Sequence, residues 1–585
     1  MDIRSSTKQA TRKNYTALVH FHGIGEQRRY EEVSSLFDEL ERYDQKVNPS
    51  LIRDIAFEAE EPRACLPRPV GYIRMSYVGG KTDRQEYRFY EAYYADLIAG
   101  GVPAGDVFRW LLSLVFKPVM ILRTPWRELP RLRRATLLGG WKQHAKKAGD
   151  APDAEYRQLL GAYDKFQDSE QFTEYRNGSF QEFLAFLGKN YSKDLIQPAK
   201  EWQFRFIQIQ LTILLLAITF LLTLGWLVIG TIAYIWQIPA QIVAFKSLGP
   251  LEIAIRLGIG LLLGAGILGA FFGIRWFLRN YVGDLHFWTT YQETAQKNQK
   301  RRAILNHCAE YLSHVLNDKY CERVVLVGHS MGTTVAHDTL LELAFRNRTL
   351  DSEGIPKKML RLDKIKHFVT VASPIDKVYY LFETWTSASY RYNRVVEAIR
   401  GDIGTFPFSD KNGPRIHWIN FWDRADVASS PLYTPTNRQF KPEQVVDNYE
   451  VAGTCFPSPV TAHSEYFKNT TVLQRLSDVF LDDRYNFVTE AKAGKKNANY
   501  LRQFIGKDAR RHGFTNAFQV FVLLLPWLIL IYGIFFALKP AFLSSIWSYI
   551  PFIVYLIFIP VGGYRDKHLR SRKNRESGVN EGGVK

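Results

Sequence analysis

The segment from Arg323 to Phe345 constrains the fold of this 585-residue chain more than any other part. Residues Arg323–Val327, R-V-V-L-V, predict a short buried strand, and Thr333–Phe345 has the spacing of a helix. Between them lies the turn G-H-S-M-G at residues 328–332. A serine at the tip of so sharp a turn has a strained backbone, so the residues two before and two after it must be small. The pattern predicts Ser330 as a nucleophile, with a serine in an ordinary turn as the alternative.

A serine hydroxyl is a weak nucleophile, so it needs a general base, and the base needs an orienting carboxylate. Among the histidines after Ser330, His337, His367 and His417 fall inside predicted helices or strands, which is typical of packed residues. His463 lies in a predicted loop, P-S-P-V-T-A-H-S-E-Y-F, after the strand-like V-V-D-N-Y-E-V-A. We therefore predict His463 as the base, with a surface loop histidine as the alternative.

Two aspartates compete for the role of the orienting acid. The predicted strand I-H-W-I-N-F-W leads into D-R-A-D-V, which contains Asp423 and Asp426. Asp423 follows the strand immediately, where it is expected to cap the turn or pair with Arg424. Asp426 lies beyond the turn and is favoured, with Asp423 as the alternative acid. In either case the carboxylate would hold the histidine tautomer and stabilise the imidazolium.

Backbone amides are the expected stabilisers of a developing oxyanion. The amide of Met331, directly after the predicted nucleophile, is one candidate. A second predicted strand, Thr16–Phe21, runs into a turn whose Ile24 amide is the other candidate; the alternative for this turn is a plain connection. The residues that support the two motifs are His22, Gly23, Gly25, Gly328, His329 and Gly332.

Four uncharged runs have the length of membrane spans. Phe206–Trp236 holds 31 residues without a charge, more than a hydrocarbon core of about 30 Å requires. Leu257–Ile274 follows after a short link, and Thr515–Leu538 and Ala541–Tyr564 form a second pair. We predict two membrane hairpins, with buried core helices of a soluble protein as the alternative.

The distribution of charge predicts an orientation for these spans. The net charge is +18, and lysine and arginine are concentrated outside the short hairpin links, which places both termini and the body between the hairpins in the cytoplasm. Residues 1–20 lack the apolar core of a signal peptide. The basic excess is then juxtamembrane, and no motif for nucleic-acid binding accompanies it. Four cysteines form no CxxC pair, so we expect no metal module and a reducing compartment.

These motifs occur in an order that resembles the α/β-hydrolase superfamily. The order is H-G-I-G at 22–25, G-H-S-M-G at 328–332, V-A-S-P-x-D at 371–376, Asp426-Val427 and His463. The form of the serine turn, the V-A-S-P-x-D segment and W-x-N-x-x-D-x-x-D-V look most like the lipase-like and GPI-inositol-deacylase-like branches. The resemblance covers residues 15–100 and 283–490. It implies an α/β fold with a mostly parallel sheet flanked by helices, an acyl-enzyme mechanism and no cofactor.

The predicted domain organisation follows from the motifs and the spans. Residues 1–100 and 283–490 would form the two parts of the hydrolase domain, and 101–205 would be an insertion. Within the insertion, Val107–Leu122 is too short to span a membrane and is predicted as an interfacial helix or as a lid. The first hairpin would occupy 206–274, the second 515–564, and a basic cytoplasmic tail 565–585.

The sequence therefore predicts a membrane-anchored serine hydrolase that acts on ester bonds, with a lipid or lipid-like ester as its substrate. The predicted partners are this substrate and the membrane, without nucleic acid, metal or cofactor. Alternatives are an acyltransferase, a thioesterase or a peptidase that uses the same residues, and a non-catalytic membrane scaffold that retains a hydrolase body.

Overall fold

The structure is a computed structural model. It describes residues 14–23, 28–60, 70–78, 86–98, 104–124, 126, 129–148, 154–168, 179–244, 288, 296–352, 360–382, 407–410, 413–423, 426, 428–435, 446–451 and 459–481.

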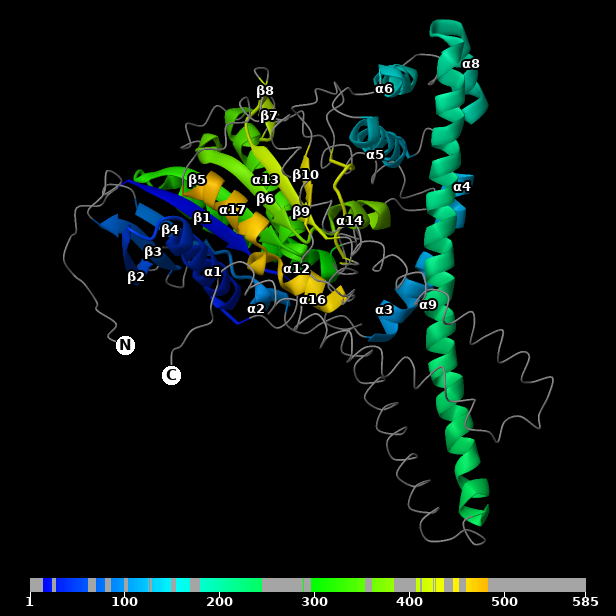
Figure 1. Ribbon diagram of the computed structural model, residues 1–585, viewed down its shortest axis with the longest axis horizontal. Helices are drawn as coiled ribbons and strands as arrows, with labels where there is room; N and C mark the ends of the chain where they lie inside the picture. The colour runs from blue at the N-terminus through cyan, green and yellow to red at the C-terminus, as the bar shows by residue number, and fades with distance from the viewer. Residues whose placement is uncertain are drawn as a thin grey trace. The chain divides into compact units, whose positions relative to one another are not determined.

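Eight of the described strands form one mixed sheet in the order β10-β9-β6-β5-β1-β4-β3-β2 (Figure 1). The pairings from β10 through β4 are parallel, whereas β3 is antiparallel to both β4 and β2. The expected mostly parallel sheet is confirmed. The strands are β1 Tyr15–Phe21, β2 Ile52–Glu60, β3 Val70–Val78, β4 Glu86–Glu91, β5 Cys321–His329, β6 Ile365–Val371, β9 His417–Trp422 and β10 Asp447–Glu450, and a separate small ribbon joins β7 Ser409–Asp410 to β8 Gly413–Pro414.

Helices flank this sheet, as expected for the fold class (Figure 1). α1 and α17 pack against each other and share a core with β1, β5, β6 and β9. α12 and α13 pack together against β5. The helices of this domain are α1 Glu31–Val47, α2 Ala95–Ile98, α12 Gln296–Asn317, α13 Met331–Ser352, α14 Ile375–Phe382, α16 Pro459–Ser464 and α17 Thr470–Phe480.

The central strands have the composition of strands buried on both faces. β1 is buried along its whole length, and the V-V-L-V run of β5 is buried on both sides. Successive side chains of β5 point to opposite faces, and Val325 and Val327 are the ones that join the core under α1 and α17. Because β1, β5, β6 and β9 are parallel, their carboxyl ends meet at one edge of the sheet, which is where functional residues gather in such folds.

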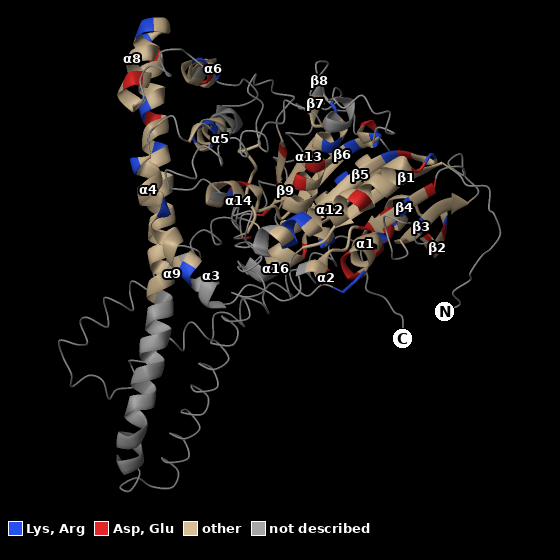
Figure 2. Ribbon diagram, turned by 180° about the vertical axis from the view of Figure 1, so that it is seen from behind, with Lys and Arg blue, Asp and Glu red and all other residues tan. Residues whose placement is uncertain are grey.

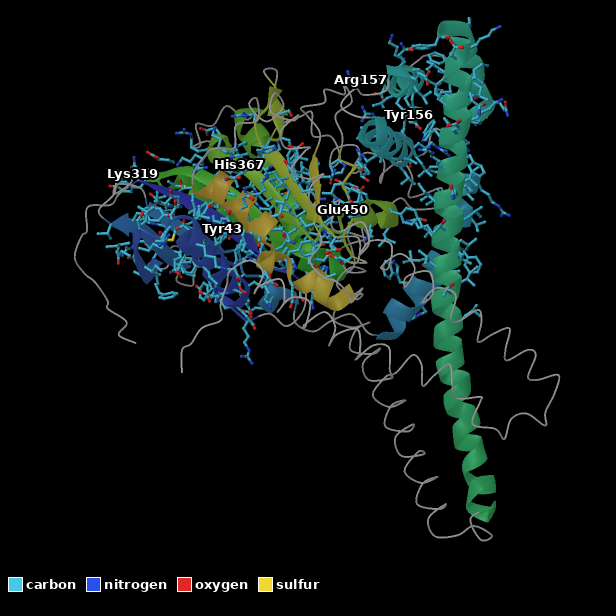
Figure 3. All side chains as sticks on the ribbon, viewed as in Figure 1. Tyr43, Tyr156, Arg157, Lys319, His367 and Glu450 are labelled. Carbon is cyan, nitrogen blue, oxygen red and sulfur yellow. The ribbon has the colours of Figure 1, made fainter. Side chains whose placement is uncertain are left out.

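A second core lies within residues 123–206. The helices α5 (Pro130–Ala148), α6 (Ala154–Asp168) and α8 (Phe180–Asn190) enclose it with the start of a long helix, α9 (Ile196–Ala244). Its centre is aromatic, and Tyr156 belongs to it (Figure 3). The guanidinium of the buried Arg133 lies 4.5 Å from the ring centre of Trp126 and 4.7 Å from that of Phe206. The cation therefore stacks on two ring faces in the interior of this helical region.

The predicted interfacial segment Val107–Leu122 is not one helix. It is divided between α3 (Ala104–Val115) and α4 (Lys117–Arg123), with a turn at Phe116. Pro118 explains why α3 does not continue and α4 begins here, because proline is well tolerated in the first turn of a helix and poorly in its interior.

The first predicted span lies within α9, which has 49 residues. The part of the structure from Lys193 to Thr219 is long and apolar enough to cross a membrane, by length and composition only. Charged residues lie along the first turns of α9, the last of them at Arg205, and Figure 2 shows such residues there. The other predicted runs, Leu257–Ile274, Thr515–Leu538 and Ala541–Tyr564, lie outside the described residues.

The chain divides into two compact units. One contains residues 1–100, 123–206 and 287–509, and the other contains 101–122, 207–286 and 510–585. The first unit holds the sheet and also most of the predicted insertion 101–205. Of the second unit, the structure describes α3, most of α4 and the part of α9 from Ile207 onward.

Candidate active site

Ser330 lies at the end of β5, immediately before α13. Its φ angle of 53° is in the left-handed region, which costs a residue with a Cβ about 1–3 kcal/mol and is retained only where the surroundings enforce it. Here the Ser330 amide donates to the carbonyl of Val371 at 2.9 Å, and the Ser330 carbonyl accepts from the Thr333 amide at 3.1 Å. The tight turn thus presents the Ser330 hydroxyl at the carboxyl edge of the sheet.

The two glycines of this turn are required by close packing. A Cβ on Gly332 would lie 2.1 Å from the carbonyl oxygen of Phe21 and 2.4 Å from that of His22. A Cβ on Gly328 would lie 2.7 Å from the Cα of Thr333. Both positions therefore exclude any larger side chain, which is the physical reason for the G-x-S-x-G spacing.

His463 approaches the serine from α16. Its Nε2 lies 2.8 Å from the Ser330 hydroxyl oxygen. The sequence predicted a loop at this position, but His463 lies near the end of a six-residue helix, Pro459–Ser464. Its side chain is 18% exposed, so the ring remains accessible beside a largely buried serine.

Asp426 contacts the other nitrogen of the His463 ring, Nδ1. Both of its carboxylate oxygens lie 3.0 Å from Nδ1 of His463. The carboxylate also accepts from the Ala428 amide at 2.8 Å and from the Tyr466 hydroxyl at 3.0 Å. Burial by itself would raise the pKa of Asp426, but these hydrogen bonds, that of His463 first, hold the pKa below its usual value. Asp426 is therefore an ionised acceptor, and Nδ1 of His463 is the donor.

Asp423, the alternative acid, has a different place in the site. Its backbone amide donates to the hydroxyl of Tyr466 at 2.8 Å, and its backbone carbonyl accepts from the Asp426 amide at 3.1 Å. The ring of His463 contacts Asp426 instead. The structure thus brings Ser330, His463 and Asp426 together, with the backbone of Asp423 supporting the loop that carries Asp426.

The turn after β1 lies directly against the serine. A Cβ on Gly23 would lie 3.3 Å from the Cβ of Ser330. His22 is stacked on Tyr94 with ring centres 4.0 Å apart, and it donates from Nδ1 to the Gly23 carbonyl at 2.6 Å while Nε2 accepts from the Tyr94 amide at 3.1 Å. Burial lowers the pKa of His22, so the ring is neutral and this tautomer fits both contacts.

The two candidate oxyanion donors differ in what the structure describes. Met331 is the first residue of α13, so its N–H has no partner within the helix and lies directly after the serine. Ile24 and Gly25 lie outside the described residues, and only the preceding His22 and Gly23 are placed.

The segment V-A-S-P-x-D forms a second strained turn next to the first. Ala372 has a φ of 55°, and its amide donates to the carbonyl of Phe421 at 3.1 Å. Asp376 accepts from the backbone amides of Tyr433 and Thr434 at 2.9 and 3.1 Å. Asp376 therefore orders the loop after Asp426.

Three further residues organise this site and were not predicted from the sequence: Tyr466, Tyr94 and Glu32. Tyr466 lies three residues after His463, Tyr94 follows β4, and Glu32 is the second residue of α1. None belongs to a short motif, and each contacts the site only because separate elements meet there. Within the described parts of the chain, no group of three His, Cys, Asp or Glu side chains is arranged to hold a metal ion.

Comparison with protein families gives one match. Residues 282–385 match the family described as "Alpha/beta hydrolase of unknown function (DUF900)". The match includes β5, the turn with Ser330, β6 and α14, and it ends before Asp426 and His463. Neither the curated proteins nor the solved structures contain a match to this chain. The mixed sheet, its flanking helices and this match establish an α/β-hydrolase-like domain and support hydrolysis as its chemistry.

Proposed function

We propose that this protein is a serine hydrolase that cleaves ester bonds through an acyl-enzyme intermediate. The observation that carries the proposal is the continuous contact from Ser330 Oγ to His463 Nε2 at 2.8 Å and from His463 Nδ1 to Asp426 at 3.0 Å. Each member has the state its role needs: a hydroxyl beside an imidazole acceptor, and an ionised carboxylate beside an imidazole donor.

The reaction has two steps with the same proton carrier. In the first, Ser330 Oγ attacks the ester carbonyl, its proton moves to His463 Nε2, and His463 returns that proton to the departing alcohol. In the second, His463 takes a proton from water, the hydroxide attacks the acyl-enzyme, and the proton goes back to Ser330 as the acid leaves. Asp426 stabilises the imidazolium in both steps and stays ionised.

The Met331 and Ile24 amides are the proposed donors to the oxyanion. The position of Met331 at the start of α13 supports its part, because the N-terminal N–H groups of a helix point toward an anion placed there. The closeness of Gly23 to Ser330 supports the part of Ile24, the residue that follows Gly23 in the sequence. Two such donors are worth several kcal/mol in the transition state.

A lipid or lipid-like ester is the proposed substrate, and the protein is proposed to be anchored by four spans with the hydrolase domain and both termini in the cytoplasm. The apolar stretch of α9 supports a membrane location by its length and composition. The resemblance to lipase-like and GPI-inositol-deacylase-like proteins supports an ester substrate of lipid character.

Fluorophosphonate labelling tests the reaction. The purified full-length protein should be labelled at Ser330, and Ser330→Ala should abolish the label while the protein stays folded. Asp426→Asn should slow labelling far more than Asp423→Asn, which carries the same charge change three residues away. A folded wild-type protein that takes no label would favour the non-catalytic scaffold.

Substrate class needs its own assay. Turnover of a phospholipid, an acylglycerol and an acyl-thioester should be compared in one detergent, with Ser330→Ala as the blank for each. Preference for the thioester would contradict the oxygen-ester proposal. Transfer of the acyl group to an added alcohol in place of water would identify an acyltransferase.

Topology is tested by labelling single introduced cysteines from either side of the membrane. Sites beside Lys246 and Lys539, in the two hairpin links, should react from outside the cytoplasm, and a site in residues 565–585 should react only from the cytoplasmic side. The opposite pattern would contradict the orientation.

A further inference from the structure

A cluster of one carboxylate and three histidines lies behind the serine, and the proposed reaction does not use it. Glu32 is in the first turn of α1, and its side chain is 16% exposed. One carboxylate oxygen accepts from the Gly23 amide at 3.1 Å and lies 3.7 Å from Nε2 of His20. The other lies 3.4 Å from Nδ1 of His329, the residue before the nucleophile. His22 completes the group through its position next to Gly23.

His329 links this cluster to the catalytic histidine. Its Nδ1 faces the Glu32 carboxylate, and its Nε2 lies 3.0 Å from the backbone carbonyl of His463. Both partners are acceptors, and a neutral imidazole has a single N–H. With Glu32 ionised, both contacts can be hydrogen bonds only when the ring is doubly protonated, so the geometry fits an imidazolium paired with a carboxylate.

Electrostatics supports the same protonation state. Burial would lower the pKa of His329, but the Glu32 carboxylate and the His463 carbonyl outweigh it and raise the pKa above its ordinary value of 6.5. Burial also acts against ionisation of Glu32, yet His329 and the other two histidines lower the pKa of Glu32 to about 2. At pH values between the lowered pKa of Glu32 and the raised pKa of His329, Glu32 is charged and His329 carries its second proton.

Through these contacts Glu32 reaches three parts of the site at once. It holds Gly23, which precedes the proposed oxyanion donor Ile24. It holds His329, which precedes Ser330. Through His329 it holds the backbone of His463, whose ring must stay within hydrogen-bond distance of Ser330. The ring of Phe467 packs on His329 with centres 5.7 Å apart and on His20 at 5.9 Å, which keeps the cluster away from solvent.

We infer that Glu32 and His329 are positioning residues for this reaction: an ion pair between the Glu32 carboxylate and the His329 imidazolium fixes Gly23, the residue before the proposed oxyanion donor, and the backbone of the general base. The inference rests on the proposed serine-hydrolase function, and it adds an alkaline limit to that activity. Neither residue touches the reacting atoms; both act through Gly23 and His463.

The pH dependence follows from the groups that surround His329. Glu32 faces it from α1, His20 and His22 from β1 and the turn after it, Asp426 from the loop after β9, and His463 from α16. Burial lowers the pKa of His20 to about 4, and it also lowers the pKa of His22, so neither becomes charged near neutrality. The pair is intact below the raised pKa of His329 and is lost as pH rises through that value. Activity should therefore fall on the alkaline side when His329 loses its second proton.

Glu32→Gln is the central test, with Glu31→Gln as the matched control on the same turn of α1. Glu31 is exposed, so its variant removes the same charge without reaching the cluster. With a soluble acyl ester assayed from about pH 5 to about pH 10, Glu32→Gln should lower kcat about 10- to 100-fold with little change in KM. In this variant, the alkaline limb of the pH–activity profile, where activity falls as pH rises, should move to lower pH. Glu32→Asp keeps the carboxylate and should restore much of the limb's position, while Glu31→Gln should match the wild type.

His329→Gln provides an independent measurement. A glutamine amide donates at every pH, so this variant should lose the alkaline limb attributed to His329 even if its kcat is lower. If Glu32→Gln does not fold, as shown by thermal unfolding, an unchanged alkaline limb in His329→Gln overturns the inference. A folded Glu32→Gln with wild-type kcat and pH profile overturns it as well.

The failure of this inference is distinguishable from failure of the proposed function. A wild-type protein that labels with fluorophosphonate, together with a Glu32→Gln variant identical to it, removes the positioning role alone. A wild-type protein that neither labels nor turns over an ester removes the reaction itself, and the positioning role with it.

Discussion

The Nδ1 atom of His463 lies 3.0 Å from each carboxylate oxygen of Asp426, and Nε2 of the same ring lies 2.8 Å from the hydroxyl of Ser330. This arrangement assigns the proton of the neutral ring to Nδ1 and leaves Nε2 free to accept. The ring can then remove a proton from Ser330 only while Asp426 remains an acceptor.

Asp426→Asn should therefore lower kcat by up to about 10⁴-fold, because the amide can turn its NH₂ toward Nδ1 and favour the wrong tautomer. The shape of the side chain is nearly unchanged, so KM for a soluble ester should change little. Steady-state kinetics measures both. Asp423→Asn is the control, and an equal loss there would mean that the acid had been assigned to the wrong aspartate.

Tyr466→Phe tests the support of that carboxylate. The Tyr466 hydroxyl donates to Asp426 at 3.0 Å and accepts from the Asp423 amide at 2.8 Å. Its removal takes away one of two partners of the buried Asp423 amide, which also donates to the Ser429 hydroxyl at 3.3 Å, and should cost about 0.5–1.5 kcal/mol of unfolding free energy. It also removes one hydrogen bond to the Asp426 carboxylate. We expect a lower midpoint in denaturant and about a 10-fold loss of kcat. Unchanged stability and rate would show that the hydroxyl is dispensable.

The contacts of Tyr466 also indicate what sequence reasoning can reach. Ser330 and Asp426 belong to short segments whose order predicted a meeting at one edge of a parallel sheet, and the structure brings them together with His463. Tyr466, Tyr94 and Glu32 organise the same site but act between elements far apart in the chain. The spacing of residues in the sequence cannot predict such contacts, because they depend on how helices and turns pack.

Local patterns also gave the wrong secondary structure in two segments whose composition fits more than one structure. The segment around His463 contains two prolines and small polar residues, which favour a loop, yet α16 forms there and carries the ring near its end. The apolar segment Val107–Leu122 reads as a single helix, but it is divided at Phe116. In both cases a proline stands in the first turn of the helix: Pro459 opens α16, and Pro118 is the second residue of α4.

Gly332→Ala should prevent the native turn from forming. The added Cβ would lie 2.1 Å from the Phe21 carbonyl oxygen, a backbone atom of a central strand that cannot move without breaking the sheet. We expect a loss of more than about 4 kcal/mol or insoluble protein. Gly161→Ala in α6 is the control, since nothing lies within 4 Å of its new Cβ, and it should be neutral or stabilising by up to about 1 kcal/mol. Equal behaviour of the two variants would contradict the packing argument.

Acid should destabilise the folded protein through its buried histidines. Burial lowers the pKa of His367 in β6 to about 3 and that of His20 in β1 to about 4. In the unfolded chain both rings take up a proton as pH falls below about 6.5, whereas the folded protein keeps them neutral until much lower pH. Their contribution is thus fully present above pH 6.5 and declines below it by up to about 1.4 kcal/mol per pH unit for each ring. Thermal unfolding between about pH 7.5 and about pH 4.5 measures the slope, and His367→Phe should reduce it because the variant has one fewer group to protonate in the unfolded state. An unchanged slope in that variant would show that His367 already binds its proton in the folded sheet.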